Sequence, residues 1–156
     1  MKKTLAVLAC VCAALGAGPS IAADAGPAVR QPSAGERVDL ARDAIKNKDW
    51  KKSLAELNLA VREEPRNADA HNLLAYSYRK QATPNLPKAF EHYKTALSLN
   101  PRHKGAHEYI GEAYLMDKKP AEAEKHLAEL ERICGNKTCE EYADLSKAIA
   151  DYKAKN

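Results

Sequence analysis

Two ten-residue stretches decide the fold of this chain: HNLLAYSYRK at residues 71–80 and HEYIGEAYLM at residues 107–116. They align residue for residue, with a large aliphatic residue in the fourth place, a small residue in the fifth and a tyrosine in the eighth. Leu74, Ala75 and Tyr78 lie at positions i, i+1 and i+4, which places them on one face of a helix. The small residue lets a neighbouring helix approach, and the large ones fill the space around it. The two stretches therefore indicate one helix used twice.

The spacing of matched residues gives the period of the repeat. Leu40 and Leu74 lie 34 residues apart, whereas Leu74 and Ile110 lie 36 apart. A two-residue insertion in ATPNLP, residues 82–87, explains both spacings. The two prolines in that segment can bound a helix but cannot lie inside one. The underlying period is 34 residues, which is typical of a helical array.

A 34-residue unit with this pattern resembles the tetratricopeptide repeat family. The resemblance implies an all-α fold, a right-handed superhelical stack of three helix-turn-helix units at residues 34–67, 68–103 and 104–137, which together fill residues 35–137. The middle unit matches best, and the residues that carry the match are Leu74, Ala75, Tyr78, Ala89, Tyr93, Ala96 and Pro101.

Residues 138–154 are predicted to form a closing helix. Thr138 and Glu141 have the spacing of a capping box, in which two side chains bind the backbone at a helix start. An apolar stripe at helical spacing follows, made of Tyr142, Leu145, Ile149 and Tyr152. Such a stripe can cover the apolar side that the third unit would otherwise expose.

The first 23 residues are predicted to be a secretory signal peptide, because two lysines precede an apolar run and small residues. Cleavage after Ala22 and cleavage after Ala23 both fit. Residues 24–34 mix Pro, Gly, Ser and Ala without apolar periodicity, which predicts a disordered leader. We therefore expect a periplasmic protein without a membrane anchor after cleavage. The sequence leaves its oligomeric state open.

Cleavage would change both the charge and the cysteine content. It removes two lysines and no acidic residue, so the formal net charge falls from +4 to +2. A nearly neutral protein lacks the concentrated basic face that nucleic acid requires. Cleavage also leaves Cys134 and Cys139 as the only thiols, and a close pair in an exported protein predicts a disulfide. The alternative is a thiol-disulfide redox protein, although the C-x4-C spacing is not the usual C-x2-C.

The family resemblance also nominates a binding surface. In tetratricopeptide repeats, fixed positions of the first helix of each unit line the inner face of the stack. The candidate partner-binding residues at these positions are Arg42, Lys46, Asn72, Tyr76, Arg79, Lys80, Glu108 and Glu112. This face would be basic in its first half and acidic at its far end, with Tyr76 as an aromatic anchor. The competing interpretation is a solvated helix face.

The expected function is therefore a protein-protein interaction or scaffold module for a protein or peptide partner. Some relatives grip a C-terminal carboxylate with a clamp of Lys, Asn and Arg side chains. The corresponding positions here do not reproduce that clamp; they hold Val38, Arg42, Leu73, Gly105 and Tyr109.

We predict no enzymatic activity and no cofactor, because no nucleophile-base pair, phosphate-binding loop or paired-carboxylate motif is evident. His71 and His107 occupy the position of a large packing residue. His103 and His107 lie at i and i+4 and leave a metal-carrier alternative open, although no further ligand converges on them in the sequence and no metal site is predicted.

Overall fold

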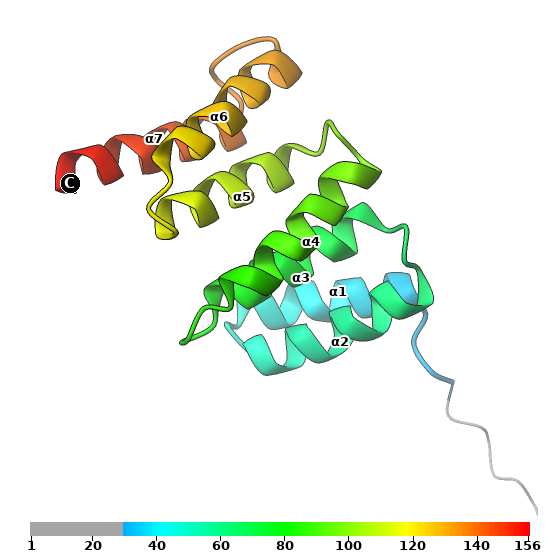
Figure 1. Cartoon of the computed structure of the whole chain (residues 1–156). Coiled ribbons are helices and arrows are strands. Elements are labelled where there is room, and N and C mark those ends of the chain that lie inside the picture. The colour runs from blue at the N-terminus through cyan, green and yellow to red at the C-terminus, as the bar shows by residue number, and fades with distance from the viewer. Residues whose placement is uncertain (1–29) are drawn as a thin grey trace, which may run out of the picture. The chain divides into compact units, whose positions relative to one another are not determined.

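The computed structural model describes residues 30–156, which form seven α-helices and no strand (Figure 1). The first helices of the three repeats are α1 (Ala34–Lys46), α3 (Ala68–Lys80) and α5 (Lys104–Met116). The second helices are α2 (Trp50–Glu63), α4 (Leu86–Leu99) and α6 (Pro120–Cys134), and α7 (Glu140–Lys155) follows. The predicted all-α repeat stack is confirmed. The predicted signal peptide, residues 1–23, lies outside the described residues.

The loop lengths locate the insertion that the spacing predicts. Residues 47–49 join α1 to α2, and residues 117–119 join α5 to α6, so each of these turns has three residues. In the middle repeat, residues 81–85 join α3 to α4, which is two residues longer. Asn85 then caps α4, since its side chain accepts a hydrogen bond from the backbone N–H of Lys88 at 3.1 Å. The insertion therefore lengthens one loop and leaves the helices unchanged.

The N-terminal end of the stack differs from the prediction. The leader was expected to reach Ala34, but Ala34 is already helical and buried. Ser33 is the N-cap of α1, and it forms a capping box with Glu36. The Ser-x-x-Glu pattern therefore starts the helix within the segment that was predicted to be disordered.

The capping box predicted for the closing helix is wrong. α7 begins at Glu140, and its N-cap is Cys139, which makes no side-chain hydrogen bond to the helix. The backbone N–H and the hydroxyl of Thr138 both donate to Asn136 Oδ1, at 2.9 Å each. Glu141 instead forms an ion pair with Lys104 at 3.3 Å. Asn136 therefore holds Thr138 in the loop and keeps it from the helix start.

Three apolar clusters form the core, and each one joins a repeat to the first helix of the next unit. Leu57 of α2 packs in a cluster with Leu74 of α3, and Tyr93 of α4 packs in a cluster with Ile110 of α5. In the third cluster α7 takes the place of a next repeat, because Leu145 and Ile149 pack with Leu130. The predicted capping role of this helix follows from that packing.

Gly111 of α5 is the point of closest approach for α7. A Cβ atom at this position would lie 2.6 Å from Cδ2 and 2.7 Å from Cδ1 of Leu145. The equivalent residues of the first two repeats are alanines, Ala41 and Ala75, and both are fully buried. The third repeat has glycine because Leu145 occupies the space that a methyl group would need.

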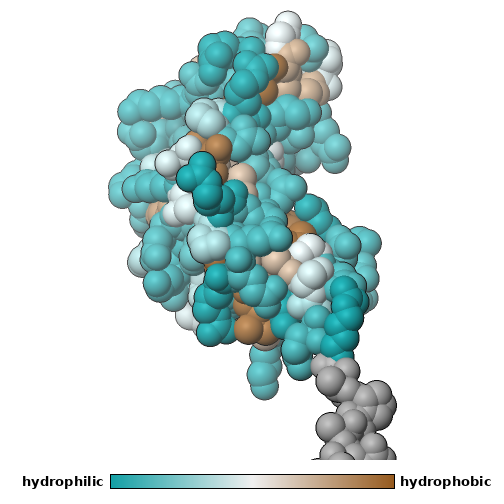
Figure 2. All heavy atoms as spheres, turned by 90° about the vertical axis from the view of Figure 1, so that its right-hand side faces the viewer, coloured by the Kyte–Doolittle hydropathy of each residue, from teal (hydrophilic) through white to brown (hydrophobic). Residues whose placement is uncertain are grey.

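The surface is mostly polar. On the face drawn in Figure 2, hydrophobic residues form small separate groups within a hydrophilic surface. Among residues 30–156, Met116 is the one exposed large hydrophobic side chain, at 45% exposure. In the same part of the chain, no helix is long and apolar enough to cross a lipid bilayer.

Candidate functional site

The candidate site is the surface where α1, α3 and α5 meet, and we call it the A-helix face. α3 contacts both α1 and α5. An aromatic row runs along it: the ring centroid of Tyr76 lies 6.2 Å from that of Trp50 and 4.8 Å from that of Tyr109. Tyr76 is half-buried at the centre of the row. Tyrosine in this setting offers an apolar ring and a polar tip to a partner.

Arg79 ties the second repeat to the third beneath this row. Its side chain is 5% exposed, and its Nη2 lies 2.6 Å from Oε2 of Glu112 on α5. Its Nε donates to the hydroxyl of the fully buried Tyr93 at 3.3 Å. The guanidinium carbon also lies 5.3 Å from the ring centroid of Tyr76 and 5.6 Å from that of Tyr109. Arg79 is therefore a buried charge held by one ion pair, one hydrogen bond and two aromatic rings.

The predicted binding residues divide into three groups by exposure. Arg42, Lys46 and Lys80 are exposed, whereas Tyr76 and Glu112 are half-buried. Asn72, Arg79 and Glu108 are buried, at 5%, 5% and 7% exposure. The sequence led us to expect a basic half and a separate acidic end. The ion pair between Arg79 and Glu112 instead joins the two halves. The exposed cations are Arg42, which pairs with Asp69, Lys46, which pairs with Asp43, and Lys80.

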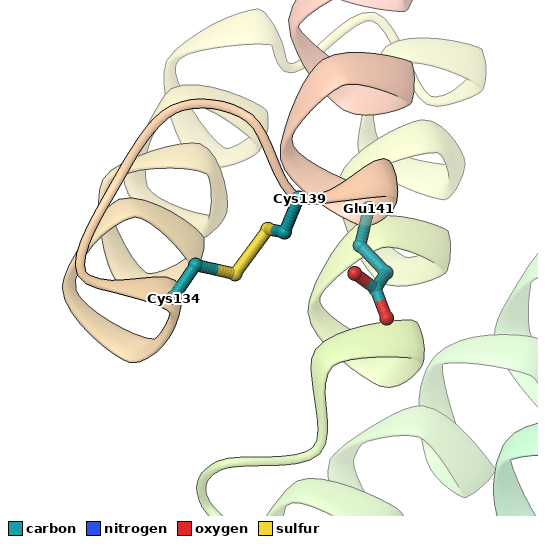
Figure 3. A group of neighbouring side chains, drawn as sticks. All are labelled: Cys134, Cys139 and Glu141. Atoms are coloured by element: carbon teal, nitrogen blue, oxygen red, sulfur yellow. A yellow bond between two sulfur atoms is a disulfide. The ribbon is translucent and has the colours of Figure 1, made fainter.

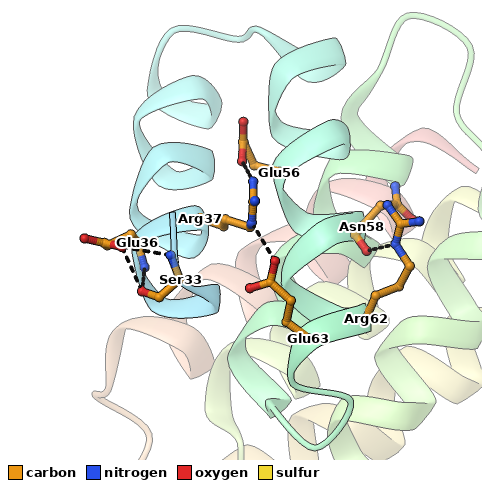
Figure 4. Close-up of polar contacts among 7 residues, drawn as sticks. All are labelled: Ser33, Glu36, Arg37, Glu56, Asn58, Arg62 and Glu63. Carbon is orange, nitrogen blue, oxygen red and sulfur yellow. Dashed lines mark hydrogen bonds and ion pairs between the residues drawn. The ribbon is translucent and has the colours of Figure 1, made fainter. Parts of the chain in front are cut away.

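Each repeat also carries a polar pair between its two helices at the same position. In the first repeat the pair is ionic: Arg37 Nη1 donates to Glu56 Oε2 at 3.0 Å, and Arg37 Nε donates to Glu63 at 2.9 Å (Figure 4). In the other two repeats the pair is formed by two imidazoles that meet Nδ1 to Nδ1. The pairs are His71 with His92 at 3.0 Å and His107 with His126 at 2.9 Å.

The proton positions in the histidine pairs follow from their other partners. Nε2 of His71 lies 3.1 Å from the carbonyl oxygen of Pro65, which can only accept, so this nitrogen carries the proton. When His71 is neutral, its Nδ1 is then an acceptor, and His92 Nδ1 must donate. The second pair repeats the arrangement, because Nε2 of His107 lies 3.1 Å from the carbonyl oxygen of Pro101. The described partners thus fix the tautomer of each pair when its imidazoles are neutral.

Our sequence reasoning found only half of these pairs. His71 and His107 were predicted to be packing residues, and both are buried. Their partners His92 and His126 were not singled out. The signal was present, since His71 and His107 are 36 apart while His92 and His126 are 34 apart, which are the two spacings of this array. Histidines that recur at both spacings occupy equivalent positions in adjacent repeats.

Mild acid is expected to weaken the fold through the His107–His126 pair. Burial and the adjacent His107 ring lower the pKa of His126 to about 4, and burial also lowers the pKa of His107. The unfolded chain titrates near 6.5, so it binds more protons than the folded chain between about pH 6.5 and 4. Because the His126 ring is partly exposed, we expect a loss on the order of 1–2 kcal/mol in the free energy of unfolding across this window.

Urea denaturation at pH 7, 6, 5 and 4.5 measures that loss. His126→Asn keeps an N–H donor for His107 but removes the titrating ring, so its stability should change less with pH than that of the wild type. The comparison cancels other groups that titrate in this range, because both proteins contain them. Equal pH dependence in the two proteins would contradict the role of this pair.

Comparisons with known proteins support the fold. The family model of the tetratricopeptide repeat matches residues 38–97 and 85–137, which is more than half of the chain. The chain belongs to the tetratricopeptide repeat family. Domains of this family generally mediate protein-protein interaction. No curated protein sequence matches this tetratricopeptide repeat protein.

Solved structures with low sequence identity share its fold. One is the first tetratricopeptide repeat domain of Spaghetti (RPAP3) bound to the HSP90 peptide SRMEEVD, with a TM-score of 0.68, 16% identity, and coverage of 78% of this chain and 94% of that chain. Another is the TPR2B-domain:pHsp70-complex of yeast Sti1, with a TM-score of 0.70 and 14% identity. The match covers 79% of this chain and 98% of that chain. A third is the type III secretion translocator chaperone SycD of Yersinia enterocolitica, with a TM-score of 0.70 and 14% identity. The match covers 83% of this chain and 98% of that chain.

The cysteine pair of this tetratricopeptide repeat protein lies between α6 and α7. The two Sγ atoms are 2.17 Å apart and the Cα atoms 6.4 Å apart, so the structure draws them as a disulfide (Figure 3). Among residues 30–156, Cys134, Cys139 and Glu141 are also the one group of three potential metal ligands that lie close together. Bonded sulfur atoms offer no thiolate, and Glu141 pairs with Lys104, so the group is not arranged as a zinc site.

The His103–His107 alternative for a metal carrier finds no support in the geometry. His103 caps α5 through Nδ1, which accepts from the N–H of Ala106 at 3.2 Å, and its Nε2 lies 2.9 Å from Asp69 Oδ1. His107 uses its two nitrogens for Pro101 and His126. All four ring nitrogens therefore have different partners, and the two rings do not share a free coordination site.

Proposed function

We propose that this protein is a periplasmic interaction module that holds a peptide segment of a partner protein against its A-helix face. One observation carries the proposal: Tyr76 is half-buried at the centre of an aromatic row and lies beside the exposed Lys80. Lys80 Nζ lies 5.9 Å from the Tyr76 ring centroid, and Arg42 and Lys46 are exposed on α1, the first helix of the preceding repeat. A central aromatic residue on a rigid support, surrounded by charged side chains, is the usual composition of a binding hot spot.

The packing beneath Tyr76 supports the proposal. The ring rests on Tyr109 and on the guanidinium of Arg79, and Arg79 is fixed by Glu112 and Tyr93. A partner that contacts Tyr76 therefore meets a surface that is already ordered, so little side-chain entropy is lost on binding. Two proteins of the same fold are solved with a ligand: Spaghetti is bound to an HSP90 peptide, and yeast Sti1 is in a pHsp70 complex. This chain lacks the residues of the carboxylate clamp, so we propose a different peptide.

Charge reversal at Lys80 is expected to weaken peptide binding at least about tenfold, which corresponds to about 1.4 kcal/mol. Peptides selected from a random display library on the purified protein supply the ligands, and fluorescence anisotropy measures their affinity for wild type and Lys80→Glu. Lys94→Glu makes the same charge change at an exposed position of α4 and should leave affinity unchanged. Failure to select any peptide, or equal loss in both variants, would count against the A-helix face.

Export and the disulfide belong to the same proposal. The N-terminal pattern of residues 1–23 and the pair of cysteines in the remaining chain both suit an oxidising compartment. We propose that the Cys134–Cys139 bond ties α7 to the end of α6. N-terminal sequencing of the protein from a periplasmic fraction checks the export, and a chain that still begins at Met1 contradicts it.

A further inference from the structure

Two buried polar side chains on the A-helix face have no partner within residues 30–156. Asn72 is 5% exposed, and its Oδ1 accepts no hydrogen bond. Glu108 is 7% exposed and makes neither a hydrogen bond nor an ion pair with the described residues. Burying such groups unpaired is costly, and nearly all buried polar groups in proteins are satisfied. Their presence therefore points to a group that is supplied from outside.

The two side chains occupy equivalent positions in adjacent repeats. Asn72 and Glu108 both come directly after the first histidine of the two aligned stretches. The Nδ2 of Asn72 lies 3.4 Å from the point where a Cβ atom of Gly105 would stand. Gly105 precedes Glu108 by three residues, so the two share one side of α5. The amide of Asn72 thus lies against α5, one helical turn from Glu108.

The surroundings of Glu108 carry an excess of negative charge. Glu112 lies on the same helix, and Asp144 and Glu141 face Glu108 from α7. Burial and these three carboxylates raise the pKa of Glu108 to about 8, against the opposing effect of Arg79. Arg79 is paired with Glu112, and Lys104 with Glu141.

Glu108 is therefore left without an ion pair in this part of the chain, whereas Asp144 lies near Lys147. Tyr76 of α3 and Tyr109 of α5, the other titratable groups beside Glu108, are neutral phenols at pH 7, since burial raises both pKa values. Arg79 acts on Glu108 but is already paired with Glu112, so no cation of the described residues forms an ion pair with Glu108.

We propose that Glu108 and Asn72 form a subsite for a cationic side chain, a lysine or arginine of the bound partner. The proposal rests on the peptide-binding function proposed above and adds the chemistry of one contact. Ammonium and guanidinium groups carry only donors, and Asn72 Oδ1 and the Glu108 carboxylate are the unfilled acceptors. The rings of Tyr76 and Tyr109 next to these acceptors suit the apolar stem of such a side chain.

Peptides from the display selection test the subsite. Selected sequences should contain a lysine or arginine at a fixed place. Replacing that residue by norleucine or citrulline, which remove the charge and keep the length, should weaken binding to the wild type at least about tenfold. The same replacement should matter less than about threefold for Glu108→Gln, because that protein has lost the carboxylate. Glu140→Gln, at an exposed acid of α7, is the matched control and should behave as the wild type.

A second measurement counts the protons that are released when a peptide binds. A cationic ligand requires ionised Glu108, which is mostly protonated at pH 7, so binding should release about one proton per peptide. Calorimetry in two buffers of different ionisation enthalpy gives this number, and it should fall to near zero in Glu108→Gln. Glutamine is neutral and nearly isosteric, so the variant is expected to fold.

The outcomes separate the two proposals. Peptides that bind without a charge requirement, or a release of protons that persists in Glu108→Gln, would overturn the subsite and leave the interaction function standing. Failure to select any peptide would overturn both.

Discussion

Replacing Arg79 with alanine is expected to lower the free energy of unfolding by about 3 kcal/mol. Removing one partner of a buried ion pair typically costs 3–5 kcal/mol, and the lower end applies because Glu112 is 28% exposed. The substitution also removes the support under the Tyr76 and Tyr109 rings and leaves the Tyr93 hydroxyl without its donor. Denaturation in urea, followed by circular dichroism at pH 7, measures the loss.

Lys80→Ala is the matched control for Arg79→Ala. Lys80 is the next residue of α3, and its charge is exposed to water. Its removal should change the stability by less than about 0.5 kcal/mol. If the two variants were equally stable, Arg79 would have to be a surface cation after all, as the sequence alone suggests.

Leu145→Ala is expected to lower the free energy of unfolding by about 2–5 kcal/mol, the usual cost for a leucine that is fully buried. Leu145→Ala should also change the sign of the effect that Gly111→Ala has on stability. In the wild type, Gly111→Ala forces a methyl group to within 2.7 Å of Leu145, and we expect a loss of about 1–3 kcal/mol. Once Leu145 is truncated, the space is free. Gly111→Ala should then stabilise the protein by about 1 kcal/mol, because alanine is the better helix former.

A double-mutant cycle at positions 111 and 145 measures this change of sign. The single variants and the double variant are unfolded in urea under one set of conditions, and the interaction energy is taken from the four values. Gly35→Ala is a suitable control, since a Cβ atom there would meet nothing within 4 Å. A stabilising Gly111→Ala in the wild type would show that α7 does not pack on α5 as the structure has it.

The helices were predictable because the same residue pattern occurs in more than one repeat, so the secondary structure of one repeat supports that of the next. One unit of this chain would have been hard to interpret, but Leu74 and Ile110 at matched places fix the register of both stretches at once. The two spacings then placed the insertion in residues 82–87, and the structure has its longer loop at residues 81–85. Buried positions that recur in each unit are dictated by the neighbouring helix, so their signal is strong.

The site was harder to predict, because exposure depends on side chains from other repeats. Arg79 and Lys80 are adjacent and equally charged in sequence, yet one is buried and the other is exposed. The difference comes from Glu112 and Tyr93, which a single helix does not reveal. The capping-box prediction at Thr138 was wrong for a related reason, because the backbone N–H and the hydroxyl of Thr138 both bind Asn136 instead of the helix start. Positions that face a ligand are constrained by the partner, which this sequence does not contain.

The polar pairs at equivalent positions differ between the repeats, so the repeats should differ in their sensitivity to acid. The first repeat is held by an arginine and two carboxylates, while the other two carry imidazole pairs in which burial lowers the pKa of His92, His107 and His126. We therefore expect acidification to loosen the C-terminal two thirds of the stack before α1 and α2, because protonation of these imidazoles works against the fold. A gradient of this kind would let the chain release whatever lies against its far end while its opposite end stays folded, and exchanging one pair for the other would move the boundary by a whole repeat.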